Sequence, residues 1–127
     1  DVAVCDIDED GREEYFVITP FHGSCFQVLK DDGDSLVPAW EYSDNIEFGH
    51  VAWGGRLRGK PAFIGGSRGG NGDIFCITYE QKRGFLMECL DHGSKPTNIC
   101  VINREDMDIV VAANRAEEEI AAYIITD

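Results

Sequence analysis

The sequence predicts an all-β fold built from three related units, and three features of the chain support this. Apolar runs of about four to eight residues, rich in Val, Ile, Phe and Tyr, alternate with turn residues along the chain, which is typical of strands. The runs recur with a regular spacing, since the equivalent positions Glu14, Ala62 and Asp108 lie 48 and 46 residues apart. Hydrophobic residues make up 43% of the 127 residues, which is enough for a packed core.

The first unit, about residues 1–47, contains four apolar runs. VAVC opens it, and an acidic turn separates that run from EYFVIT. A loop containing Pro20 and Gly23 precedes SCFQVLK, and LVPAWEY is the fourth run. We expect these runs to form one four-stranded antiparallel sheet.

The second unit, about residues 48–95, repeats this order. HVAWGG and PAFIGGS flank a short turn, and DIFCITYE and FLMECLD follow. Its glycine cluster is not a phosphate-binding loop, because neither a Lys-Ser/Thr pair nor a helix follows it. We expect these glycines to let the backbone turn tightly; they are Gly65, Gly66, Gly69, Gly70 and Gly72.

The third unit, about residues 96–127, lacks a fourth run. NICVIN and DIVVAAN are its first two runs, and EIAAYIITD is its third. The segment RAEEEIAA, residues 115–122, has good helix propensity, but its position in the repeat favours a strand.

Four short antiparallel strands per repeat are typical of the blades of a β-propeller, with a β-sandwich as the alternative. Three blades are too few for a closed ring, which needs about four to eight. An open arc leaves a blade face and strand edges uncovered. We therefore expect the remaining blades of a longer propeller, or a second copy of the chain, to be partners.

Charge and composition exclude several classes of protein. The chain has 24 acidic and 11 basic residues, a formal charge of −13, which argues against nucleic acid or anionic membranes as partners. No run of about 18 apolar residues indicates a transmembrane helix. The chain begins at Asp1 without a signal-peptide pattern, so we expect an excised or processed chain.

The five cysteines are expected to be unpaired. Their number is odd, no CxxC pair occurs, and each lies in an apolar run, so the sequence predicts free, buried thiols. Free thiols favour a reducing compartment, which we take to be the cytoplasm.

The segment from Asp6 to Glu14 has the spacing of a calcium loop. Its acidic residues stand at positions 1, 3, 5 and 9, a glycine at position 6 permits the turn, and the carbonyl of position 7 faces inward. An EF-hand needs Glu at position 12, which here is Val17. The sequence therefore predicts one Ca²⁺ site formed by Asp6, Asp8, Asp10, the carbonyl of Arg12, and Glu14.

This nine-residue loop between two strands resembles the calcium loop of FG-GAP and related integrin-type propeller repeats. The resemblance implies that the ion stabilises the first blade and takes no part in a reaction. The family usually has Asp at the last position, so Glu14 is a departure. The other two units lack the loop.

Polar side chains are expected at the opposite end of the strands. Loops that follow an even number of strand reversals share one end, the end at which propellers commonly bind ligands. Sequence order assigns His22, His50, Arg68, Asn98 and Arg115 to that end. His22 and His50 are candidates for a second divalent metal or for acid/base groups, whereas His92 is expected to be a turn residue.

The segments DIDEDGREEYFVITPFHG, HVAWGG, GKPAFIGGSRGG and DIFCITYE are also similar to the propeller part of the aldos-2-ulose dehydratase group and its bacterial relatives. That resemblance implies a sugar-like ligand. The sequence thus favours a calcium-stabilised propeller segment that contributes to a carbohydrate-type site. Two alternatives remain: a keto-sugar lyase or isomerase that is active only with further blades, and a protein–protein interaction module. A contiguous exposed aromatic patch around Trp40 and Tyr42 would favour the interaction module.

Overall fold

The computed structural model describes residues 1–127 and contains eleven strands and no helix. The strands are β1 (Val2–Cys5), β2 (Glu14–Thr19), β3 (Cys25–Asp31), β4 (Leu36–Tyr42), β5 (Ile46–Leu57), β6 (Lys60–Gly70), β7 (Ile74–Glu80), β8 (Gly84–Asp91), β9 (Pro96–Asn103), β10 (Asp108–Asn114) and β11 (Glu119–Ile125). The predicted all-β class is confirmed. No helix is long and apolar enough to cross a membrane.

The strands form three antiparallel sheets, each with its strands in sequence order. The first sheet is β1-β2-β3-β4, the second is β5-β6-β7-β8, and the third is β9-β10-β11. None of them closes on itself. Two of the equivalent positions in the repeat, Glu14 and Asp108, are the first residues of β2 and β10.

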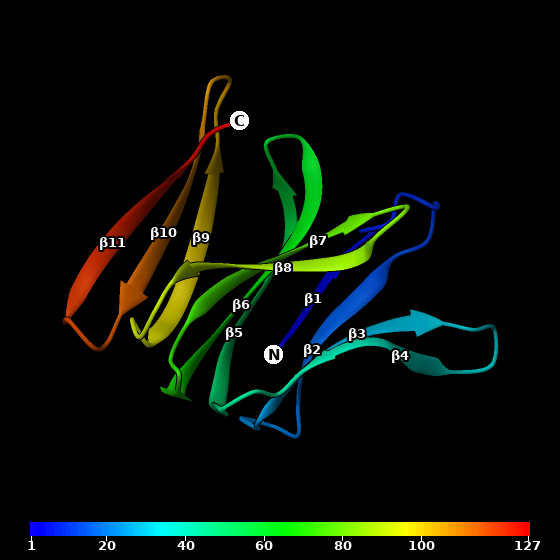
Figure 1. The fold of residues 1–127 in the computed structure, drawn as a ribbon, viewed down its shortest axis with the longest axis horizontal. Helices are drawn as coiled ribbons and strands as arrows, with labels where there is room; N and C mark the ends of the chain where they lie inside the picture. The colour runs from blue at the N-terminus through cyan, green and yellow to red at the C-terminus, as the bar shows by residue number, and fades with distance from the viewer.

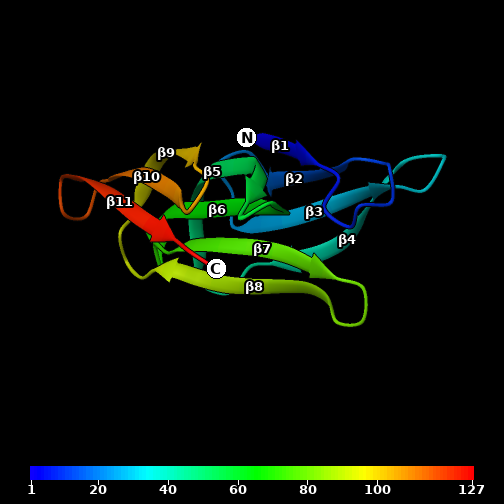
Figure 2. The same ribbon diagram turned by 90° about the horizontal axis from the view of Figure 1, so that it is seen from above.

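The three sheets lie side by side, with the second sheet in the middle (Figure 1). The first strands come together across the sheets, because β5 contacts both β1 and β9. In Figure 2 β1, β5 and β9 lie along one edge of the molecule, and the strand order of each sheet runs away from that edge. The chain is therefore a row of three sheets with two interfaces between them.

Each interface has its own apolar core. Between the first and second sheets, four buried phenylalanines pack with ring centroids 5.0 to 6.3 Å apart: Phe16, Phe26, Phe63 and Phe75. The second core joins the second and third sheets and consists of Leu57, Ala62, Ile64, Ile74, Cys76, Val110 and Ala112. The middle sheet is thus covered on both faces.

Two glycines serve the packing of the sheets, not the turn that the sequence led us to expect. Gly65 and Gly66 lie inside β6. A Cβ at Gly65 would meet Cζ of Phe75 at 2.4 Å, and one at Gly66 would meet Cγ of Pro96 at 2.5 Å. Their missing side chains let both neighbouring cores approach β6.

The third sheet has one covered and one open face. In β10 the buried residues Val110 and Ala112 face the second sheet, so Val111 and Ala113 face away from it. The strand register adds Cys100, Ile102, Ile120 and Ile124 to the same side. Ile120 is 74% exposed and Ile124 is 56% exposed. We call this side the open face.

Three local expectations need correction. The strand expected over residues 115–122 begins only at Glu119, and residues 115–118 form the turn before it. The cysteines are unpaired, but only Cys76 is buried, because Cys89 lies on an edge strand and Cys100 lies on the open face. Trp40 and Tyr42 are partly buried against the first core, so they form no exposed aromatic patch.

Candidate functional site

The loop between β1 and β2 brings acidic side chains together. Carboxylate oxygens of Asp6, Asp8 and Glu14 lie within 4.8 Å of one another. The Asp6 carboxylate accepts hydrogen bonds from the backbone N–H groups of Asp10, at 3.0 Å, and Gly11, at 2.9 Å. Gly11 has a φ of 92°, which a residue with a side chain rarely adopts, so the turn depends on this glycine.

Glu14 is the buried member of the group. Its Oε2 accepts a hydrogen bond of 3.0 Å from the Ile7 N–H, whereas its Oε1 is buried without a hydrogen-bond partner. Burial raises the pKa of this carboxyl group, the Ile7 N–H opposes that rise, and the nearby Asp8 charge adds to it. A buried carboxylate oxygen without a hydrogen bond costs free energy, so a cation bound at Oε1 would stabilise it.

A lysine from β3 points into the same group. Lys30 Nζ donates to Asp8 and lies 3.3 Å from Asp10 Oδ2 and 3.5 Å from Glu14 Oε1. The hydrogen bond to Asp8 is the main cause that raises the Lys30 pKa above its ordinary value. One ammonium thus faces three carboxylates at the place where a cation would bind.

The equivalent carboxylate of the third unit is fully paired. Asp108 accepts backbone hydrogen bonds from Arg58, at 2.5 Å, and Arg104, at 3.3 Å, and the Arg58 guanidinium lies 3.8 Å away. The hydrogen bond from the Arg58 N–H is the main cause that lowers the Asp108 pKa. Asp108 is therefore a structural carboxylate that links the second and third sheets.

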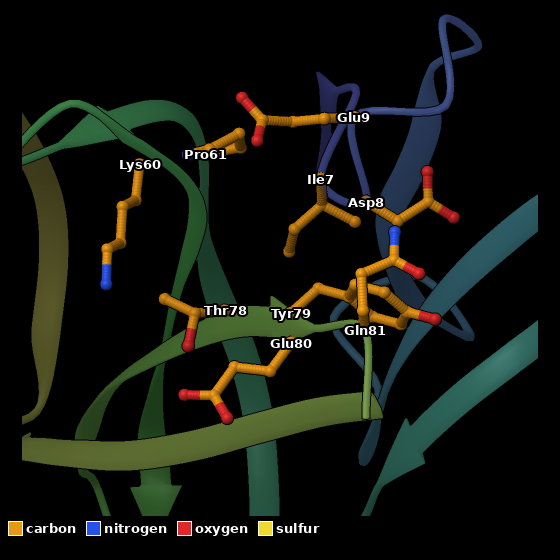
Figure 3. Close-up of a pocket in the computed structure, with 9 residues that line it drawn as sticks. All are labelled: Ile7, Asp8, Glu9, Lys60, Pro61, Thr78, Tyr79, Glu80 and Gln81. Carbon is orange, nitrogen blue, oxygen red and sulfur yellow. The ribbon is translucent and has the colours of Figure 1, made fainter. Parts of the chain in front are cut away.

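A cavity of about 300 Å³ lies beside the acidic loop (Figure 3). Ile7, Asp8 and Glu9 line it from the loop, Lys60 and Pro61 from the start of β6, and residues 78–81 from the end of β7 and the turn after it. Glu9 also pairs with Arg56 of β5 across the two sheets, at 3.1 Å. The cavity gives access to the loop, and its mostly polar lining suits water and ions.

Aromatic and histidine rings stack at the opposite end of the strands. The His22 ring lies 4.0 Å from that of Phe21, 4.6 Å from that of Phe48 and 5.7 Å from that of His50, centroid to centroid. The Arg68 guanidinium lies over the Phe48 ring at 5.1 Å. We call these five residues the aromatic–histidine cluster. Three of the residues assigned to this end by sequence, namely His22, His50 and Arg68, therefore meet.

The cluster contains polar groups without partners. His50 Nδ1 and Arg68 Nε are buried and make no hydrogen bond, and Arg68 has no carboxylate within 4.0 Å. Burial lowers the pKa of His50, a backbone contact with Thr97 opposes this, and the Arg68 charge adds to it. An arginine without a carboxylate partner beside exposed ring surface suits a polar ligand with an apolar face.

The backbone of the cluster is held in an uncommon conformation. His22 has a φ of 50° and Phe48 a φ of 53°, in the left-handed region that side chains disfavour. The β5–β6 register shifts directly after Phe48, between Gly49 and Val51. Such conformations persist where the surrounding structure enforces them, and they are frequent at binding sites.

Asn98 and Arg115 share this end of the strands but make no contact with the cluster. Asn98 lies on the open face, beside Val111, Ala113 and Ile120, and its Oδ1 accepts from the Ile99 N–H at 2.9 Å. Arg115 is exposed in the β10–β11 turn, where its N–H donates to the Lys95 carbonyl at 3.1 Å.

Sequence reasoning did not identify Lys30, Phe21 or Phe48. Lys30 is the last residue of an apolar run, and the strand register of β2 and β3 is the only signal that directs it to the acidic loop. Phe48 precedes Gly49 and His50, and its unusual backbone has no sequence signature of its own.

The chain matched no protein-family model, no curated protein and no solved structure in comparisons with each of these.

Proposed function

We propose that the three sheets are consecutive blades of a β-propeller that is stabilised by one Ca²⁺ ion in the β1–β2 loop and binds a carbohydrate-type ligand at the aromatic–histidine cluster. The strand order within each sheet and the meeting of the first strands across sheets support the propeller. The observation that carries the calcium proposal is the buried Glu14 Oε1, which lacks a hydrogen bond and lies close to the carboxylates of Asp6 and Asp8.

The donor atoms of the loop suit calcium. All of them are oxygens, which hard cations prefer, and Ca²⁺ binds oxygen at about 2.3 to 2.6 Å. Two oxygens on opposite sides of such an ion are about 4.8 Å apart, the limit within which the oxygens of Asp6, Asp8 and Glu14 fall. A divalent ion offsets more of their negative charge than the Lys30 ammonium does, and it gives Glu14 Oε1 a partner.

Calcium binding requires Lys30 to withdraw from the loop. Its four-carbon side chain is flexible and 35% exposed, so the ammonium has a route to solvent. Lys30 therefore stabilises the loop in the absence of calcium and weakens the affinity of the loop for the ion.

The aromatic–histidine cluster offers the two surfaces that a sugar needs. Phe21 is 81% exposed at the end of the stack and Phe48 is 41% exposed, so ring surface is free for the apolar face of a pyranose. The Arg68 guanidinium, which lies over the Phe48 ring and has no carboxylate partner, supplies N–H groups for its oxygens. The net charge of −13 opposes anions in general, but the Arg68 guanidinium has no carboxylate partner, so at this site it favours a sugar acid over a neutral sugar.

The test is a titration of the protein with glucuronate and, separately, with glucose, followed through the imidazole NMR signals of the histidines. Saturable shifts of the His22 and His50 signals are expected, at lower concentration with glucuronate. Phe48→Ala and Arg68→Ala should abolish them, whereas Leu36→Ala, which removes an exposed apolar side chain outside the cluster, should not. If the histidine signals of the Phe48→Ala protein shift as much as those of the wild type, the ligand does not bind at the cluster.

The open face supports a second proposal, that the chain assembles with a further sheet. It lies opposite the face by which the third sheet packs on the second sheet, so another sheet can continue the row. We propose that this sheet comes from further blades or from a second copy of the chain, whose first sheet exposes Val2 and Val4. Such a contact would remove apolar surface from water.

A further inference from the structure

Three side chains of different chemistry converge at the end of β8, where the chain leaves the second sheet, away from both sites described above. Asp73 precedes β7, Cys89 lies near the end of β8, and His92 lies in the turn before β9. His92 Nδ1 is 3.4 Å from Cys89 Sγ and 3.3 Å from Asp73 Oδ2, and all three donor atoms lie within 4.8 Å of one another. We propose that these three residues bind a divalent transition metal, with zinc as the ion that fits best.

Hydrogen bonds can join these side chains only in pairs. A single imidazole nitrogen, Nδ1, faces both the thiol and the carboxylate, and it carries at most one proton. When that proton points to Asp73, the Cys89 thiol donates to the Asp91 carbonyl instead, at 3.4 Å, so no hydrogen bond links all three donor atoms. A cation at the centre bonds to the nitrogen, the sulfur and the oxygen at once.

The two distances from His92 Nδ1 fit a zinc tetrahedron. Zinc binds sulfur at about 2.3 Å, imidazole nitrogen at about 2.0 to 2.1 Å and carboxylate oxygen at about 2.0 to 2.2 Å. Tetrahedral angles between such bonds place nitrogen about 3.5 Å from sulfur and about 3.4 Å from oxygen. The measured separations are 3.4 and 3.3 Å.

Neighbouring groups hold the ligands in place. The Gly93 N–H donates to Asp73 Oδ1 at 3.0 Å, which leaves Oδ2 for the ion. The Cys89 thiol donates to the Asp91 carbonyl at 3.4 Å, a hydrogen bond that is given up when the thiol binds a metal, and the Asp91 carboxylate accepts from the Tyr123 hydroxyl of β11 at 2.6 Å. A metal at this point would fix the end of β8 to the start of β7 and to the turn that leads to β9.

The donor set selects a metal different from that of the acidic loop. Sulfur and nitrogen ligands favour zinc over calcium, whereas the loop offers only oxygen. The His92 side chain is 83% exposed, so water can supply the fourth ligand. Binding replaces the S–H bond of Cys89 by a sulfur–metal bond and releases the thiol proton to solvent.

Cobalt titration of the whole chain under reducing conditions tests the site, because a cobalt–thiolate bond has its own charge-transfer absorption. We expect this absorption to saturate at one equivalent of Co²⁺, to disappear when Zn²⁺ is added, and to be unaffected by excess Ca²⁺. It should be absent in Cys89→Ser, present in Cys100→Ser, and weakened at least tenfold in apparent affinity in His92→Gln and Asp73→Asn. Cys100 is the matched control, since it is also an exposed, unpaired cysteine.

Circular dichroism of each variant confirms that the sheets have formed before the metal is added. Absence of the charge-transfer band in the folded wild-type protein would overturn the proposal. So would a band that persists in Cys89→Ser or that is lost in Cys100→Ser.

Discussion

The ammonium nitrogen of Lys30 lies 3.5 Å from Oε1 of Glu14, the one carboxylate oxygen of the chain that is buried without a hydrogen-bond partner. The same nitrogen donates to Asp8 and lies 3.3 Å from Asp10. Lys30 is thus an internal cation of the acidic loop, and its charge lies where a calcium ion would have to bind. Competition between this lysine and a metal is the main physical consequence of the arrangement.

Replacing Lys30 with methionine removes the internal cation and leaves the calcium ligands in place. Lys30→Met keeps the apolar stem but removes the charge, so Ca²⁺ no longer displaces an ammonium from Asp8, Asp10 and Glu14. We expect calcium affinity, measured by isothermal titration calorimetry, to rise about tenfold, or ~1.4 kcal/mol. The calcium-free protein should melt at a lower temperature, because its carboxylates lose their counter-charge. The control is Lys82→Met, in an exposed turn; an unchanged or weaker affinity in Lys30→Met would contradict the competition.

Asp108 should make the joint between the second and third sheets sensitive to acid. Its pKa is lowered in the folded state, so the stabilisation that the ionised Asp108 gives to the fold is fully present above the unfolded carboxyl pKa of about 3.9. This stabilisation is lost as the pH falls through the lower pKa of the folded state. Asp108→Asn should cost roughly 1 to 3 kcal/mol at neutral pH, because one backbone N–H loses its acceptor.

The measurement is urea unfolding of the wild type and of Asp108→Asn between pH 7 and about pH 3. The difference in unfolding free energy between the two proteins should shrink toward the acid end. Asp34→Asn, in an exposed turn, serves as the control. A difference that stays constant over this range would show that the Asp108 charge does not contribute.

The open face predicts association in solution. Light scattering should give the wild-type protein a mass above 14.1 kDa. Ile120→Lys should reduce the mass, because a charge on an apolar face that association removes from water is costly. Met87→Lys, at an exposed position on the edge strand of the second sheet, should leave the mass unchanged. A folded, dispersed wild-type species of 14.1 kDa would count against the proposed assembly.

The repeat in the sequence predicts the strands well because its signal is local. Runs of β-branched and aromatic residues between turns define where strands begin, and Glu14 and Asp108 indeed begin β2 and β10. Counting strand reversals also assigns His22 and His50 to one end of the sheets, and their rings lie 5.7 Å apart. The apolar runs between turns and the number of strand reversals can both be read from the sequence, and they are sufficient for these conclusions.

The remaining features depend on which faces the sheets present to one another. Asn98 shares an end with His50, but the alternation of β9 directs it to the open face. Cys100 is exposed for the same reason, although it lies in an apolar run. Lys30 reaches the acidic loop only through the register of β3 on β2. No local pattern encodes such contacts between segments.

The most direct test of the account is the melting temperature of the wild type and of Asp8→Asn in excess calcium and in chelator. If the β1–β2 loop binds one Ca²⁺ ion, calcium at about a hundred times its dissociation constant should stabilise the wild type by ~2.7 kcal/mol and raise its melting temperature. Asp8→Asn should lose this increase, while Asp34→Asn should keep it. A wild-type melting temperature that is the same in calcium and in chelator, or an equal increase in Asp8→Asn, would contradict the calcium site.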